Sequence, residues 1–141
     1  MGKIINNIEE VRVGFPNAKL LQEKGFDCIC SFAFNGAYEP HHLNIIELGF
    51  KQSNSELLKN VFTAPTQQVA IDWFRINFGI HVDCQVEGIN LDIYRFICFK
   101  TSDERVKETI KHIEDDSHNG RYDTPEEAKE VAINYVLINL I

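Results

Sequence analysis

Residues 66–99 read TQQVAIDWFRINFGIHVDCQVEGINLDIYRFICF, and a change of hydrophobic period within them decides the fold. The first part predicts a helix, because large apolar side chains recur at mostly three- and four-residue spacing. These side chains are Val69, Ala70, Trp73, Phe74 and Phe78. Gly79 stands where a left-handed residue would end the helix. From residue 80 the period becomes two, which predicts a strand with one polar face. A turn at 87–90 then returns the chain as a hairpin partner over 91–99.

The residues before this stretch predict one helix and two strands. Pro16 suits a first helical turn, so we expect a short helix over 16–24. Residues 27–34 alternate as a strand does. The side chains expected on one side of that strand are Cys28, Cys30, Phe32 and Phe34. A second strand is expected over 43–50, followed at 53–60 by a loop with at most one helical turn.

Two further helices are expected after the hairpin. Residues 101–104 (TSDE) match a capping box, and a narrow apolar stripe follows as far as Ile113. Thr124, Pro125 and Glu127 are the strongest helix start in the chain: a capping threonine, a proline at the first helical position and a glutamate at the third. The side chains that this last helix should present to a core are Ala128, Val131, Ala132, Tyr135, Val136 and Leu140.

The order of the expected elements is α-β-β-α-β-β-α-α. The length of 141 residues suits one ordinary domain, and we interpret 1–141 as a single globular domain. Antiparallel hairpins with helices on one face make an α+β fold of two layers. We therefore expect one antiparallel sheet of about four strands, built from two hairpins, with the helices packed on one of its faces.

The charge is uneven along the chain. The formal net charge is −7, and residues 103–130 alone hold 10 acidic and 5 basic side chains. A duplex-binding protein needs a basic stripe that neutralises phosphates, and none is present, so direct nucleic-acid binding is not expected. The acidic segment either meets a basic partner surface, imitates a nucleic-acid backbone, or is an ordinary solvated face.

The cysteines favour a reducing compartment. All four (Cys28, Cys30, Cys84 and Cys98) stand among apolar residues, and we expect them to be small buried hydrophobes. The first residues lack the apolar run of an export signal. Residues 131–141 are too short and too interrupted to span a bilayer. These observations predict a cytoplasmic protein that does not enter a membrane.

One set of residues has the types that bind zinc. Cys28 and Cys30 precede His41 and His42, and thiolates with imidazoles are zinc ligands. Structural zinc sites use a wider cysteine spacing, however, and these cysteines share their strand face with phenylalanines. We therefore expect no metal and no cofactor.

A second set lies on the polar face of the strand that begins at residue 80. His81 and Asp83 could share a proton in general acid–base catalysis, but the alternation alone explains them as the solvent side of a strand. The chain has neither a nucleophile motif nor a phosphate-binding glycine loop. A loose cation site is conceivable at His112, Asp115, Asp116 and His118, but such a cluster is more often a hydrated helix end. No catalytic residue is predicted.

Several stretches resemble a known group of proteins. They are Ala64-Pro65-Thr66, Asp72-Trp73-Phe74, Gly79-Ile80-His81-Val82, residues 20–27, and the closing run from 123–128 to 139–141. The chain resembles a family of small uncharacterised proteins found in Bacteroides-type gut bacteria and in their phages and mobile elements. The resemblance implies a phage- or element-encoded protein and carries over no activity and no functional residue.

Two hypotheses of function follow. The first is a non-enzymatic accessory protein that acts by protein–protein contact, with the acidic segment 103–130 as its surface. The second is a small-molecule or metal-binding domain, with or without catalysis, that uses the face around His81 and Asp83; a concave pocket there would support it.

The apolar end of the chain also needs a second surface, either its own core or a second copy. The residues concerned are Leu137, Ile138, Leu140 and Ile141.

Overall fold

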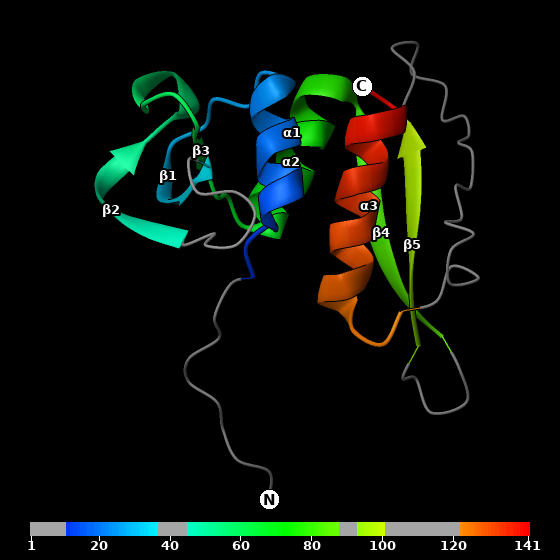
Figure 1. Cartoon of the computed structure of the whole chain (residues 1–141). Helices are drawn as coiled ribbons and strands as arrows, with labels where there is room; N and C mark the ends of the chain where they lie inside the picture. The colour runs from blue at the N-terminus through cyan, green and yellow to red at the C-terminus, as the bar shows by residue number, and fades with distance from the viewer. Residues whose placement is uncertain (1–10, 37–44, 88–92, 101–121) are drawn as a thin grey trace, which may run out of the picture.

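The computed structural model describes residues 11–36, 45–87, 93–100 and 122–141 and confirms an α+β fold with antiparallel strands (Figure 1). The α-helices are α1 (Phe15–Glu23), α2 (Gln67–Phe78) and α3 (Pro125–Asn139), with a short 3₁₀ helix, η2 (Asn54–Glu56). The strands are β1 (Cys30–Asn35), β2 (Ile45–Gln52), β3 (Val61–Thr63), β4 (Ile80–Glu87) and β5 (Ile93–Lys100). The expected hairpins are both present, since β1 pairs with β2 and β4 with β5.

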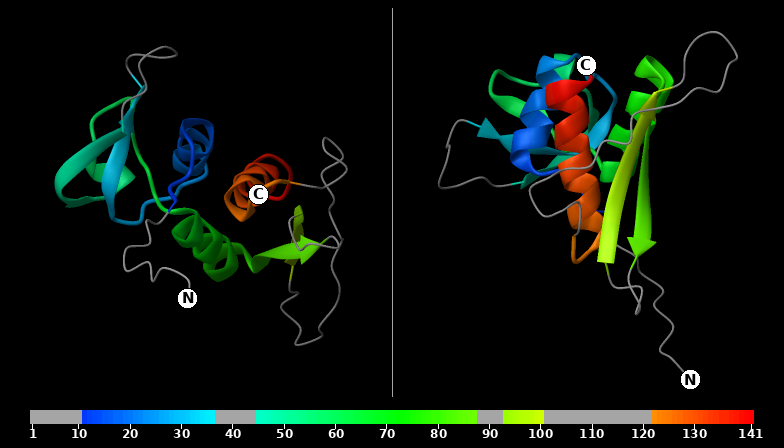
Figure 2. Two further views of the ribbon diagram at one scale, coloured as in Figure 1. Left: turned by 90° about the horizontal axis from the view of Figure 1, so that it is seen from below. Right: turned by 90° about the vertical axis from the view of Figure 1, so that its right-hand side faces the viewer.

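The strands divide between two sheets. One sheet has three strands in the order β2-β1-β3, and the other contains β4 and β5. The helices lie between the two sheets, as Figures 1 and 2 both show. Strand β3 is absent from the sequence-based expectation because three residues are too few to display a period of two. Pro65 follows β3, and α2 then carries the chain away to the second sheet.

Helix boundaries follow local side-chain chemistry. The Thr66 hydroxyl accepts a hydrogen bond from Val69 N at 3.2 Å, and the Thr124 hydroxyl accepts one from Glu127 N at 3.2 Å. Each bond satisfies a backbone donor that the first turn of the helix leaves free. Gly79 adopts a left-handed conformation with φ 64° and ends α2, as expected.

Strand β1 departs from simple alternation. Its pairing with β2 shifts between Cys30↔Gln52 and Phe32↔Glu47, so β2 carries extra residues at this point. The irregularity breaks the expected face: Ala33 is fully buried, whereas Phe32 and Phe34 are half-buried. Cys28 lies before the strand and is exposed. The expectation that all four cysteines are buried is therefore wrong for Cys28, and Cys84 is only half-buried.

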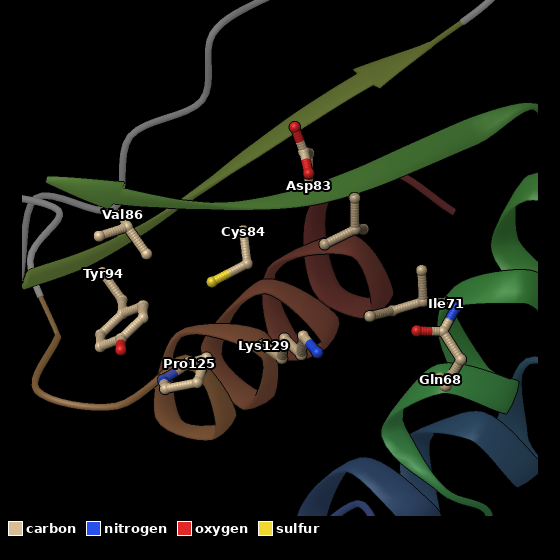
Figure 3. A pocket seen from close by; sticks show the side chains of 9 residues that line it. Gln68, Ile71, Asp83, Cys84, Val86, Tyr94, Pro125 and Lys129 are labelled. Carbon is tan, nitrogen blue, oxygen red and sulfur yellow. The ribbon is translucent and has the colours of Figure 1, made fainter. Parts of the chain in front are cut away.

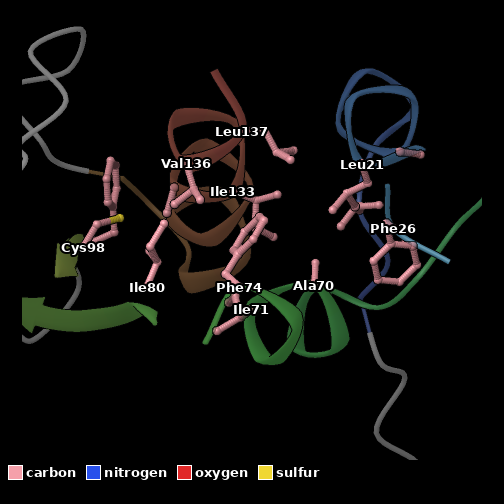
Figure 4. Packing of buried hydrophobic residues seen from close by; sticks show 14 of the residues in the cluster. Leu21, Phe26, Ala70, Ile71, Phe74, Ile80, Cys98, Ile133, Val136 and Leu137 are labelled. Atoms are coloured by element: carbon pink, nitrogen blue, oxygen red, sulfur yellow. The ribbon is translucent and has the colours of Figure 1, made fainter. Parts of the chain in front are cut away.

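The core joins the three helices to both hairpins (Figure 4). Trp73 packs against Phe26 and Phe78, with ring centroids 5.4 and 5.1 Å apart, so it belongs to the core as expected. Ile133 and Leu137 are also fully buried, although the single-face pattern of α3 did not include them. Helix α3 contacts α1 and α2 as well as the β4–β5 sheet, and it therefore buries more than one face.

Some expectations lie outside the described residues. These are the capping box at 101–104 with the helix that follows it, the turn at 87–90 beyond Glu87, and most of the acidic segment. Within the ranges that are described, no helix is long and apolar enough to cross a membrane.

Candidate functional site

The predicted polar face of β4 is an open strand surface. Asp83 is exposed, and His81 is half-buried and stacks on Phe99 of the neighbouring strand with ring centroids 4.9 Å apart. Residues opposite one another in the pairing share a face, so His81 and Asp83 lie beside Phe99 and Ile97. The structure therefore places the two residues on one face, as expected, but apolar side chains are their partners across the hairpin.

A pocket of about 340 Å³ lies where β4 faces α2 and α3 (Figure 3). In Figure 3, Cys84 and Tyr94 point from the hairpin toward α3, whereas the Asp83 carboxylate points away from that helix. The lining residues are Gln68, Ile71, Val82, Asp83, Cys84, Val86, Tyr94, Pro125 and Lys129. The concave surface is thus mainly on the opposite side of β4 from His81, and Asp83 stands at its rim.

Cys84 contributes a thiol, a potential nucleophile, to the lining of this pocket. Burial raises the pKa of its thiol, and the charge of Lys129 acts weakly in the opposite direction. A thiol with a raised pKa is protonated near neutral pH and is a poor nucleophile. The pocket therefore offers a hydrogen-bonding and apolar lining rather than an activated thiolate.

Of the four zinc candidates, the structure describes the two cysteines. Cys28 is exposed, whereas Cys30 is buried and its thiol donates to the Cys28 carbonyl oxygen at 3.5 Å. His41 and His42 lie outside the described residues. In the described part of the chain, no three histidine, cysteine or acidic side chains are grouped as metal ligands would be.

A second pocket, of about 190 Å³, lies between β1 and the start of α2. We call it the Arg12–Lys51 pocket. Its lining residues are Arg12, Ile29, Cys30, Ser31, Phe32, Lys51, Ala64, Pro65, Thr66 and Val69. Sequence reasoning missed it, because its two cations come from segments far apart in the chain.

The third surface feature is β2 itself, one of the two edge strands of the larger sheet. Ile45, Ile46 and Phe50 are exposed along it, and we call these three side chains the β2 surface. Phe50 is 71% exposed. The sequence carried a weak signal for this surface, since apolar residues at both odd and even positions of a strand cannot all face one core.

Comparisons with protein-family models, with curated proteins and with solved structures found no match to this chain. The described residues define an α+β protein whose function is to be inferred from its own surfaces.

Proposed function

We propose that this chain is a non-enzymatic accessory protein that acts by contact with another protein. The observation that carries the proposal is the β2 surface. An exposed edge strand with large apolar side chains is a template for pairing with another chain, and folded proteins usually cover or charge such edges. Origin in a phage or mobile element remains part of the proposal and rests on the sequence resemblance alone.

The contact surface proposed here differs from the acidic segment. The exposed acidic residues that the structure describes in that segment are Asp123, Glu126 and Glu127. Glu130 is engaged inside the fold, where its carboxylate accepts hydrogen bonds from Asn17 and Gln67. The β2 surface offers apolar area, which stabilises protein interfaces more than exposed charges do.

A second function, small-molecule binding, is favoured by the pocket between β4, α2 and α3. Its volume of about 340 Å³ falls within the usual range for ligand pockets of roughly 300–1,000 Å³. The pocket supports this function less strongly, because the Asp83 side chain points away from α3 and the Cys84 thiol is not activated.

The contact proposal is tested by photo-crosslinking in the native host. A photoreactive phenylalanine analogue replaces Phe50 in one variant and Ile76 in a control. Ile76 is an apolar residue of α2 that is 69% exposed, so the two positions match in exposure and differ in surface. We expect a discrete covalent adduct with one other protein from position 50 and none from position 76.

The same adducts from both positions would indicate non-specific contact, and no adduct from either would remove the support for a partner. An adduct between tagged and untagged copies of this chain would show that β2 contacts a second copy of the chain and not a different protein.

A further inference from the structure

The Arg12–Lys51 pocket has an electrostatic character opposite to that of the whole protein. The net charge of the chain is −7, yet the charged side chains that line this pocket, Arg12 and Lys51, are both cations. No carboxylate is among the described residues that line it. The pocket therefore favours an anionic group.

Backbone and ring contacts hold Arg12 in position. Arg12 forms an antiparallel bridge with Thr66, and Val13 N donates to Pro65 O at 3.0 Å. Its guanidinium lies 3.5 Å from the centre of the Phe32 ring. Stacking uses the face of the guanidinium and leaves its N–H edge for a planar acceptor such as a carboxylate.

Among the described residues, no anion neutralises the two cations. Neither Arg12 nor Lys51 forms an ion pair or a side-chain hydrogen bond with another residue in the ranges that the structure describes. Thr66, which caps α2, also lines the pocket, and the positive end of that helix dipole adds to the potential there.

The size and rim of the pocket indicate what kind of anion fits. About 190 Å³ is below the usual volume of a small-molecule site and suits one side chain. Ile29 and Val69, both exposed, line the pocket, so the residues beside the anion should be apolar. Lys51 directly follows Phe50 in β2, and consecutive side chains of a strand point to opposite faces, so the pocket is a separate feature from the Phe50 side chain.

We propose that the Arg12–Lys51 pocket binds a glutamate or aspartate side chain of an extended partner segment that has apolar residues on either side. The inference rests on the proposed function, because it names the chemistry of the partner that the contact requires. The carboxylate binds the N–H edge of Arg12 and the ammonium of Lys51, while the apolar neighbours cover Ile29 and Val69.

A peptide titration tests this assignment. The probe is a short capped peptide with one central glutamate between valines, and its control has glutamine in place of the glutamate. Both are titrated to millimolar concentration into the isotope-labelled full chain, and amide shifts are followed by NMR. We expect saturable shifts at Ser31, Thr66 and Val69 with the glutamate peptide alone, and weaker binding as salt is added.

Matched variants identify the cations. The double variant Arg12→Gln/Lys51→Gln should weaken binding of the glutamate peptide about tenfold or more, because it removes both charge-assisted contacts. The control Arg75→Gln/Lys19→Gln removes the same charge from exposed positions outside the pocket and should bind as the unmodified chain does. Unchanged spectra away from the pocket show that each variant is folded.

Three results would overturn the assignment: no binding of the glutamate peptide, equal binding of the glutamine peptide, or unchanged affinity in the Arg12→Gln/Lys51→Gln variant. If the Phe50 crosslink to a partner still forms in any of these cases, the contact function stands and only the pocket assignment fails. If that crosslink is absent, the contact function itself fails.

Discussion

At the scale of single residues, Glu130 connects all three α-helices. Its Oε1 accepts hydrogen bonds from Gly14 N at 2.6 Å and from Asn17 Nδ2 at 2.8 Å, and its Oε2 accepts one from Gln67 Nε2 at 3.0 Å. Gly14 caps α1, so the carboxylate lies at the positive end of that helix. Asn17 and Gln67 are buried, and their side-chain amides donate both to this carboxylate and to the backbone oxygens of Glu130 and Glu126.

Replacing Glu130 should therefore destabilise the fold. We expect Glu130→Ala to lower the free energy of unfolding by about 2 kcal/mol, because it leaves the Gly14 N–H without its acceptor and removes one hydrogen bond each from Asn17 and Gln67. Glu130→Gln keeps an acceptor oxygen and should cost less. Urea denaturation measures both changes, with Glu127→Ala on the exposed side of the same helix as a control that costs about 0.5 kcal/mol. Equal effects of Glu130→Ala and Glu127→Ala would contradict the role of Glu130.

At the scale of elements, α2 and α3 begin at capping threonines, and the hairpins pair as their alternation indicates. The β4–β5 pairing runs without interruption from Ile80↔Lys100 to Glu87↔Ile93. The β1–β2 pairing is irregular, and although Gly49 stands among the extra residues of β2, the sequence does not determine the register there. Local chemistry thus predicts helix ends better than it predicts strand register, because a helix cap is satisfied within four residues and a register depends on a distant strand.

The cap of α3 allows a direct measurement. Thr124→Ala should reduce the free energy of unfolding by about 1 kcal/mol, since it removes the acceptor of the Glu127 N–H. Thr124→Ser retains the hydroxyl and should restore most of that loss. The readout is the urea midpoint at unchanged slope. A Thr124→Ser variant as unstable as Thr124→Ala would show that the hydroxyl is not the stabilising group.

At the scale of the whole molecule, one core holds α1, α2 and α3 against both hairpins. Two phenylalanines differ strongly in their exposure to solvent within this arrangement. Phe74 on α2 is fully buried in the core, whereas Phe50 on β2 is 71% exposed. The difference separates the side chains that stabilise the fold from those that are available to a partner.

The same substitution at both positions measures this difference. Phe74→Ala should cost about 3–5 kcal/mol because it leaves a cavity among the helices. Phe50→Ala should change the free energy of unfolding by no more than about 0.5 kcal/mol. Thermal and urea unfolding of the two variants provide the comparison. A large loss for Phe50→Ala would mean that β2 is part of the stabilising core and would weaken the contact proposal.

The sequence by itself determined the α+β class, the start of α3, the end of α2 at Gly79, both hairpins and the place of Trp73 in the core. These features depend on caps and periods that act over a few residues. Only the tertiary structure decided the division into two sheets, the burial of Ile133 and Leu137, and the exposure of Cys28. It also brought Arg12 and Lys51 into one pocket. Each of these depends on which distant segments meet, and that is set by packing of the whole chain rather than by local pattern.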